Sequence, residues 1–290
     1  MRTEKEVTDM VLDAANRDET VRAVIRTNLL PERDFAYYNY YFIVSDLEKY
    51  DRDIFETCFG DRILLYRGDR NYPELFPDGE KAHLMVFRDG VTIAVNIMDQ
   101  SAFLARYNGE KSHENVWIGD TYLKIMDKDN ALPEIRRLEE KQTWFAETPS
   151  EEQFIGTCSE FWWVLKTFAE YTLREELPSA MFYLNVAVRD LLNRMIRWYL
   201  YLRAGRPVDI GILDCNMEKL LDEDLFSLYQ KTYPSAEYEQ IWKAYDAVVR
   251  LWTTIGKDIA ERCGYAYSTD TENDMLHLIR GLSGQRRRQT

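Results

Sequence analysis

The sequence predicts an α+β fold, with a mixed β-sheet and flanking helices in the N-terminal half and an all-helical bundle in the C-terminal half. Two observations predict it. Residues 35–44 and 83–98 are rich in β-branched and aromatic residues, as strands are. From residue 148 onward, long stretches instead repeat apolar residues at helical spacing. The predicted division is a sheet domain at 1–145, a helical domain at 146–267 and a flexible tail at 268–290.

The composition excludes some classes of protein. The 290-residue chain has 46% hydrophobic and 30% charged residues, which excludes a chain that is disordered throughout. Its net charge of −13 argues against binding nucleic acid over a broad surface and suits a cationic partner instead. No apolar stretch approaches the ~20 residues that span a bilayer, and the N-terminus lacks signal-peptide features. We therefore expect a cytoplasmic protein that does not associate with membranes.

Metal-binding motifs of cysteine and histidine are also missing from the sequence. The four cysteines and three histidines are widely spaced, and no pair has the spacing of a zinc site. We expect the cysteines to be free, buried thiols.

Apolar periodicity and turn residues predict the N-terminal elements. Residues 3–18 form an amphipathic helix, and Thr3 with Glu6 gives its start a capping-box pattern. A second helix is expected in the polar stretch 46–58. Short strands are predicted at 21–26, 35–44, 62–67 and 122–126.

Residues 83–98 predict a β-hairpin, because two strand-like runs are joined by Asp89-Gly90. This dipeptide favours a type I′ turn, in which both central residues have positive φ. Side chains alternate along a strand. One face of the second strand therefore carries Val91, Ile93, Val95 and Ile97. The other face, which is more polar, carries Thr92, Ala94, Asn96 and Met98.

Four helices are expected in the second half. Thr148 is predicted to cap the first, with Glu151 completing a capping box, and the helix runs on to Pro178. The second spans 180–204 and ends at Gly205. The remaining two are predicted at 216–231 and at 236–263, where Gly264 ends the last.

Several strings of residues resemble one known family. They occur in the family's order and extend over roughly residues 1–267. The strings are Met1-Arg2-Thr3-Glu4-Lys5-Glu6, Arg22-Ala23-Val24-Ile25, Cys158-Ser159-Glu160-Phe161-Trp162-Trp163, Leu184-Asn185 with Val188-Arg189, Trp198-Tyr199, Thr232-Tyr233-Pro234 and Ile241-Trp242-Lys243-Ala244. On these motifs, the chain resembles the aminoglycoside (streptomycin) 6-adenylyltransferases, a branch of the polymerase-β-like nucleotidyltransferases.

The resemblance implies a particular chemistry. Members of this family transfer AMP from ATP to a hydroxyl group of streptomycin with the help of Mg²⁺, which prefers hard oxygen ligands. A Gly-Ser dipeptide after the first strand holds the triphosphate. Two Asp residues at i and i+2 of the next strand share one face, and a third Asp on a neighbouring strand acts as base or ligand.

This sequence departs from the family at every one of those positions. The Gly-Ser dipeptide falls on Asn28 and Leu29, which leaves a degenerate nucleotide-binding position. The paired Asp residues fall on Tyr37 and Asn39, and the third falls on Ala94. We therefore predict a catalytically degenerate member, a pseudoenzyme with no metal ligands and no expected cofactor, which retains at most the binding of a cationic small molecule.

Two alternatives remain open at this point. The chain is an active enzyme if displaced acids such as Asp34 or Asp46 bind Mg²⁺ and ATP is the donor. Alternatively, the fold serves as a protein-interaction module, with a protein partner or a homodimer interface in place of an open pocket.

The candidate substrate pocket of the helical half contains Glu160, Trp163, Arg189 and Asp190. Glu160 either lines an acidic cleft for a cationic substrate or is solvated. The Trp162-Trp163 pair is expected in the core, with a ligand platform as the alternative. Arg189 is expected in a structural ion pair, with a phosphate contact as the alternative. The stretch 209–219 corresponds to a family segment with glycines and lysines, of which Gly211 and Lys219 are kept.

Overall fold

The computed structural model divides the chain into two compact units, Met1–Thr143 and Trp144–Thr290. The division lies two residues before the boundary that the sequence predicts. The structure describes residues 1–27, 37–50, 58–60, 62–68, 81–108, 122–130, 132, 148–211 and 214–286.

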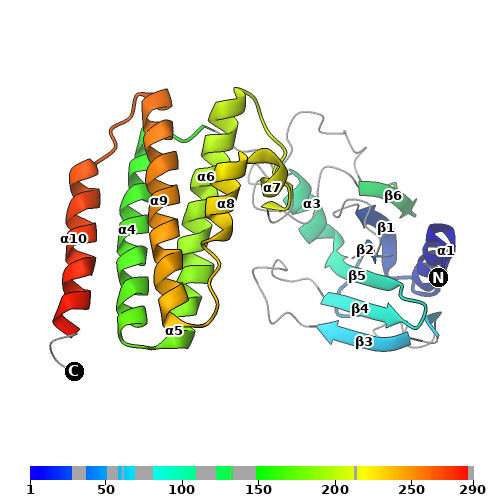
Figure 1. The fold of residues 1–290 in the computed structure, drawn as a ribbon. Coiled ribbons are helices and arrows are strands. Elements are labelled where there is room, and N and C mark those ends of the chain that lie inside the picture. Colours follow the sequence, from blue (N-terminus) through cyan, green and yellow to red (C-terminus); the bar gives the residue numbers. More distant parts are fainter. Residues whose placement is uncertain are drawn as a thin grey trace. The chain divides into compact units, whose positions relative to one another are not determined.

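The first unit is built on a six-stranded mixed sheet, shown in Figure 1, with strand order β3-β4-β5-β2-β1-β6. Its strands are β1 (Val21–Thr27), β2 (Tyr37–Val44), β3 (Arg62–Gly68), β4 (Lys81–Phe87), β5 (Thr92–Asp99) and β6 (Tyr122–Asp127). β2 and β5 are parallel, whereas the other neighbouring strands are antiparallel. The α+β prediction and all six predicted strands are confirmed.

One face of the sheet is covered by α1 (Glu4–Arg17), whose capping box of Thr3 and Glu6 is formed as predicted. The helix buries a small apolar stripe that includes Val7 and Val11 against the sheet. The predicted apolar face of β5 packs into the same cluster. Because strand side chains alternate, the other face carries a second cluster, in which Ile43 and Met98 meet α3 (Gln100–Asn108).

The β4–β5 hairpin forms with a turn other than the predicted one. Gly90 has a φ of 86°, but Asp89 does not have positive φ. The amide of Gly90 donates to the carbonyl of Phe87, and the amide of Phe87 donates to Val91. This is a three-residue loop with glycine in the left-handed position, so the type I′ prediction is wrong. Asp89 instead accepts a hydrogen bond from the backbone amide of Arg2 at 2.9 Å.

The second unit is a helical bundle. Its helices are α4 (Glu151–Leu173), α5 (Leu177–Phe182), the π-helix η2 (Tyr183–Val188), α6 (Arg189–Ala204), α7 (Met217–Leu220), α8 (Glu223–Gln230), α9 (Tyr238–Cys263) and α10 (Thr269–Arg286). Phe161 of α4 stacks on Trp252 of α9, with ring centroids 3.6 Å apart, at the centre of a large apolar core. Gly205 and Gly264 end their helices in the left-handed conformation, as predicted.

Several predicted helix boundaries need correction. The cap of α4 is Ser150, which pairs with Gln153, rather than Thr148 with Glu151. The predicted 180–204 helix starts inside α5, which begins at Leu177 with Pro178 in its first turn, and continues through the π-helix η2 into α6. The 216–231 helix is broken into α7 and α8 at Leu221. Part of the predicted 46–58 helix lies outside the described residues, and 47–49 form a turn.

The tail is not loose over residues 269–286, where the structure has helix α10. Figure 1 shows α10 alongside α4, which it contacts. Ile279 is buried in the bundle core, and Glu272 accepts a hydrogen bond from Tyr267 at 2.7 Å. A few well-placed side chains therefore anchor a helix whose average composition is polar.

Two further expectations concern the cysteines and the membrane. The four cysteines are free thiols, but Cys215 is exposed and the others are half-buried, so the expectation of burial is wrong. Within the described part of the chain, no helix has the length and apolar character needed to cross a bilayer.

Candidate functional site

The positions singled out by the family resemblance lie together on one face of the sheet. β2 and β5 run parallel and in register, so that Tyr37 pairs with Thr92, Asn39 with Ala94 and Tyr41 with Asn96. Residues two apart on a strand share a face. Tyr37, Asn39 and Ala94 therefore occupy neighbouring positions at the beginning of the two strands. The sequence prediction that these three positions converge is consistent with this register.

An amide pair occupies the centre of this face. The side-chain amide of Asn96 donates to Oδ1 of Asn39 at 2.8 Å and also to the backbone carbonyl of Tyr40 at 3.3 Å. Both asparagines are buried, with exposed fractions of 7% for Asn39 and 4% for Asn96. A buried amide requires such partners, because its desolvation is otherwise uncompensated. Hence the oxygen that Asn39 could offer to a ligand already accepts a hydrogen bond.

The described neighbours of this amide pair on β2 and β5 are uncharged. Ala94 is buried and contributes only a methyl group, whereas Tyr37 is 41% exposed at the start of β2. Asn28 and Leu29 lie outside the described residues. Among the residues that the structure does describe, no group of three His, Cys, Asp or Glu side chains could hold a metal ion. The described side chains next to the amide pair can therefore hydrogen-bond a ligand, but they carry no negative charge. Asp127 of β6 lies on the same face of the sheet, where its carboxylate pairs with Lys124 at 3.2 Å and accepts a hydrogen bond from the amide of Leu132 at 3.2 Å.

The nearby acids in the sequence have other roles. Asp46 follows β2, accepts hydrogen bonds from the backbone amides of Glu48 and Lys49 at 3.0 and 3.3 Å, and pairs with the Lys49 ammonium at 2.9 Å. Asp89 is held in the hairpin by Arg2. Asp34, the other displaced-ligand candidate, lies outside the described residues.

Arg189 is buried, but not in the ion pair that the sequence predicts. Its two terminal nitrogens donate to Oγ1 and to the carbonyl oxygen of Thr232 at 2.9 and 3.0 Å. Its guanidinium carbon lies 3.5 Å from the centroid of the Tyr233 ring. Within the described part of the chain no carboxylate pairs with it. Arg189 therefore joins the start of α6 to the segment after α8, and the predicted ion pair is corrected to hydrogen bonds and a cation–π contact.

The other three pocket candidates are exposed. Glu160 and Trp163 stand three residues apart on α4, so they are neighbours on one helix face, and Trp163 is 73% exposed. Trp162 packs into the core of the bundle, as predicted. The same prediction is wrong for Trp163, which is exposed. Asp190 pairs with Arg194 one turn along α6 at 3.0 Å.

Two further arrangements were not anticipated from the sequence. Asn96 was placed on the polar face of β5, but its bond to Asn39 depends on strand pairing that no local pattern encodes. Asp214 lies in the degenerate 209–219 segment and accepts two hydrogen bonds from Arg197, both at 2.8 Å. Asn193 donates to the same carboxylate at 3.1 Å. The only sequence signal for this cluster was the polar stripe of α6.

A family model matches nearly the whole chain, and the relatives below share its sequence at low identity. Residues 1–282 match the model of the streptomycin adenylyltransferase family. The chain is 27% identical to an aminoglycoside 6-adenylyltransferase from Campylobacter jejuni, over 97% of this chain and 96% of that protein. It is also 27% identical to one from Bacillus subtilis, over 92% and 93% of the two chains. A crystal structure of an aminoglycoside 6-adenyltransferase from Bacillus subtilis covers 97% of this chain and 99% of its own, with a TM-score of 0.46 and 23% identity. The extent of the family match over residues 1–282 decides the assignment: the chain belongs to the streptomycin adenylyltransferase family.

Proposed function

We propose that this chain is a family member that has lost Mg²⁺-dependent adenylyl transfer and retains the binding of a cationic small molecule of the aminoglycoside class. The relatives are named aminoglycoside 6-adenylyltransferases, and the chain matches them over nearly their full length. One observation carries the proposal. The positions that the family resemblance assigns to its three acids carry Tyr37, Asn39 and Ala94, and these residues are neighbours in the register of β2 and β5.

The residues at this face do not fit a magnesium ion. Mg²⁺ binds oxygen ligands, carboxylates above all, in octahedral geometry. Ala94 has no ligand atom, Tyr37 offers a neutral phenol, and the oxygen of Asn39 accepts a hydrogen bond from Asn96. A phosphoryl-transfer site without its metal loses most of its charge neutralisation. We therefore expect no requirement for Mg²⁺ or ATP, and we derive no catalytic step at this face.

The displaced-ligand alternative has less support. Of the two acids it names, the described one, Asp46, is fixed by two backbone amides and by Lys49. To reach a metal ion beside Asn39, the Asp46 carboxylate would have to break these contacts, and the chain after β2 would have to turn back along the strand. An assay for adenylylated streptomycin separates the two proposals directly.

The proposed cation contact lies on α4. Glu160 forms no hydrogen bond or ion pair within the described part of the chain, and Trp163 exposes most of its indole ring beside it. A carboxylate next to an exposed indole attracts a cation both by charge and by the π face of the ring. Streptomycin carries guanidinium groups, which match this combination.

The binding part of the proposal is tested by calorimetric titration of streptomycin into the protein without nucleotide. We expect a Kd in the micromolar range, about −8 kcal/mol. Glu160→Gln and Trp163→Ala should each weaken binding about three- to tenfold, whereas Glu152→Gln on the same helix should leave it unchanged. If the parent protein gives no saturable heat, the retained binding is disproved. Equal affinities of the Glu160 and Glu152 variants would remove α4 as the contact.

A further inference from the structure

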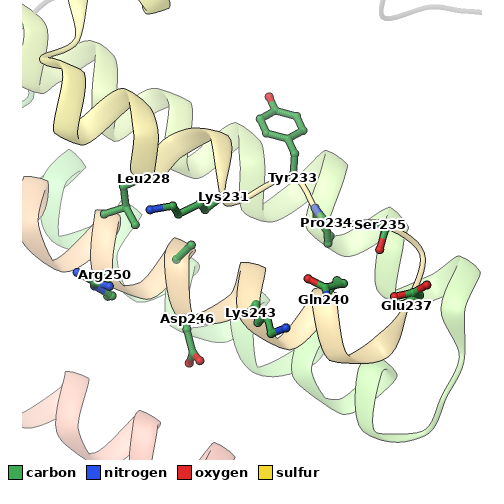
Figure 2. A pocket seen from close by; sticks show the side chains of 11 residues that line it. Leu228, Lys231, Tyr233, Pro234, Ser235, Glu237, Gln240, Lys243, Asp246 and Arg250 are labelled. Carbon is green, nitrogen blue, oxygen red and sulfur yellow. The ribbon is translucent and has the colours of Figure 1, made fainter.

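A groove of about 720 Å³ opens in the helical unit, and Tyr233, on whose ring Arg189 stacks, forms part of its lining. One wall is the end of α8 with the segment 231–237, and the other is the first half of α9 (Figure 2). Its volume lies within the usual range for small-molecule sites, roughly 300–1,000 Å³.

The groove exists because two adjoining elements diverge over a small residue. Along α9, Lys243, Ala247 and Arg250 follow one another at helical spacing and line the same wall. Ala247 is buried and forms part of the floor, where a larger side chain would fill the space. α8 ends at Gln230, and Pro234 then prevents the following segment from continuing as a helix along α9. The divergence of these two backbone segments therefore helps to open the hollow, which exposed side chains of both walls line.

Two cations from opposite walls line this hollow. Lys231 and Arg250 lie at the same end of the groove in Figure 2. Within the described residues, neither side chain has a hydrogen bond or an ion pair, although Asp246 stands one turn before Arg250. Most cations of this unit are neutralised, as Arg197 is by Asp214, Arg203 by Asp222 and Arg262 by Asp258. Lys231 and Arg250 are thus two uncompensated cations in one hollow of a chain whose net charge is −13.

The other end of the groove has a different character. Lys243 is paired with Glu239 at 2.7 Å, so its charge is already compensated. Beyond it, Ser235, Glu237 and Gln240 line the groove and present hydroxyl, carboxylate and amide groups. A second anionic group would be repelled there by Glu237, whereas a neutral body with hydrogen-bond donors would be accepted.

We propose that this groove binds a small phosphate monoester, with its phosphate between Lys231 and Arg250 and its neutral, hydrogen-bonding body toward Gln240. A phosphate monoester carries about −1.5 to −2 charges at pH 7, which balances two cations, whereas a single carboxylate would balance only one. Arg also binds phosphate oxygens through two parallel hydrogen bonds, and Lys adds a point charge. This inference goes beyond the proposed function and does not depend on it.

The test uses AMP and inorganic phosphate as probes, with adenosine as the uncharged comparison, and the full chain without Mg²⁺ or streptomycin. We expect AMP and phosphate to bind saturably, with a Kd below about 1 mM for AMP, and adenosine to bind far more weakly. Backbone amide shifts should localise the site to residues 231–237 and 243–250. The Lys231→Gln/Arg250→Gln double variant should lose at least about tenfold in affinity.

The matched control is Arg206→Gln/Arg280→Gln, which removes two positive charges from exposed positions outside the groove. It should bind AMP as the parent does. Equal losses in the two double variants would mean that only net charge matters, and the groove site would be disproved. Unsaturable binding of both anions, or AMP shifts confined to the sheet unit, would overturn it as well. Thermal unfolding and circular dichroism of both variants check that each is folded.

Discussion

Replacing Ala94 with aspartate is expected to lower the free energy of unfolding of the sheet unit by more than about 3 kcal/mol at pH 7. Ala94 is 2% exposed and is flanked by Asn39 on β2 and Leu84 on β4. No described cation is placed to pair with a carboxylate there. We therefore expect the position that the resemblance assigns to an acid to disfavour one in this chain.

The pH dependence of this loss follows from the direction of the pKa. Burial disfavours the charged form, so the pKa of the new carboxyl rises in the folded state above its unfolded value of about 4. The destabilisation is smallest below the unfolded pKa, where the group is neutral in both states. It grows as the pH rises toward the folded pKa and is complete above that value. Urea denaturation at pH 4 and pH 7 measures the difference, and hydrogen exchange of β5 amides assigns it to this unit.

The control for charge is Ala94→Asn, which has nearly the same shape as aspartate. It should cost clearly less than Ala94→Asp at pH 7, and the two should converge at low pH. Addition of Mg²⁺ should not stabilise the aspartate variant, because Tyr37 and Asn39 supply no second carboxylate. A marked rise of its unfolding temperature with Mg²⁺ would show that a metal site survives, contrary to our proposal.

Replacing Arg189 with methionine is expected to destabilise the helical unit by about 2–4 kcal/mol. The guanidinium group makes two hydrogen bonds to Thr232, which is fully buried, and stacks on Tyr233. Removing it leaves the Thr232 carbonyl without this donor and Tyr233 without its cation. Arg189→Lys should recover only part of the loss, because a lysine cannot place two donors in a fixed fork.

Arg194→Met on the same helix is the matched control. Its ion pair with Asp190 is solvent-exposed, so its loss should stay within about 0.5 kcal/mol. Urea denaturation of the three variants gives the comparison. If the Arg189 and Arg194 variants lose the same stability, Arg189 does not join α6 to the segment after α8 in the way described.

The elements that the sequence predicts best depend on local signals. The capping box of Thr3 and Glu6, the glycine stops at Gly205 and Gly264, and the alternating face of β5 each depend on residues close in the chain. Such signals act through one hydrogen bond, one backbone conformation or one periodicity, and these are visible in a short stretch of sequence.

The errors arise where distant parts of the chain compete with a local preference. The Asp89-Gly90 dipeptide favoured a type I′ turn, but the Asp89 carboxylate accepts a hydrogen bond from Arg2, which lies 87 residues earlier in the sequence. Trp163 matched a core pattern, but only Trp162 faces the bundle. The polar residues 269–286 form a helix because a few side chains, Ile279 among them, reach the core. The low average apolar content of this segment predicted a flexible tail, because an average does not show that single side chains such as Ile279 pack into the core.

The candidate site also has features that the sequence predicts and features that depend on contacts between distant parts of the chain. The resemblance placed Tyr37, Asn39 and Ala94 together, and the parallel register of β2 and β5 brings them together. That Asn96 bonds to Asn39 could not be predicted, since it depends on the alignment of two strands more than fifty residues apart. The groove at Lys231 and Arg250 was missed for a similar reason: an unpaired charge is recognised only when its neighbours in space are known.

The most direct measurement is an assay of AMP transfer from ATP to streptomycin in the presence of Mg²⁺, with the product detected by mass spectrometry. The aminoglycoside 6-adenylyltransferase of Bacillus subtilis serves as the active comparison under the same conditions. On our account, AMP transfer was lost when Tyr37, Asn39 and Ala94 replaced the family's acids. We therefore expect this chain to form no adenylylated streptomycin above the protein-free background. Mg²⁺-dependent formation of that product, abolished by Asp46→Ala, would contradict this account and establish an enzyme with displaced ligands.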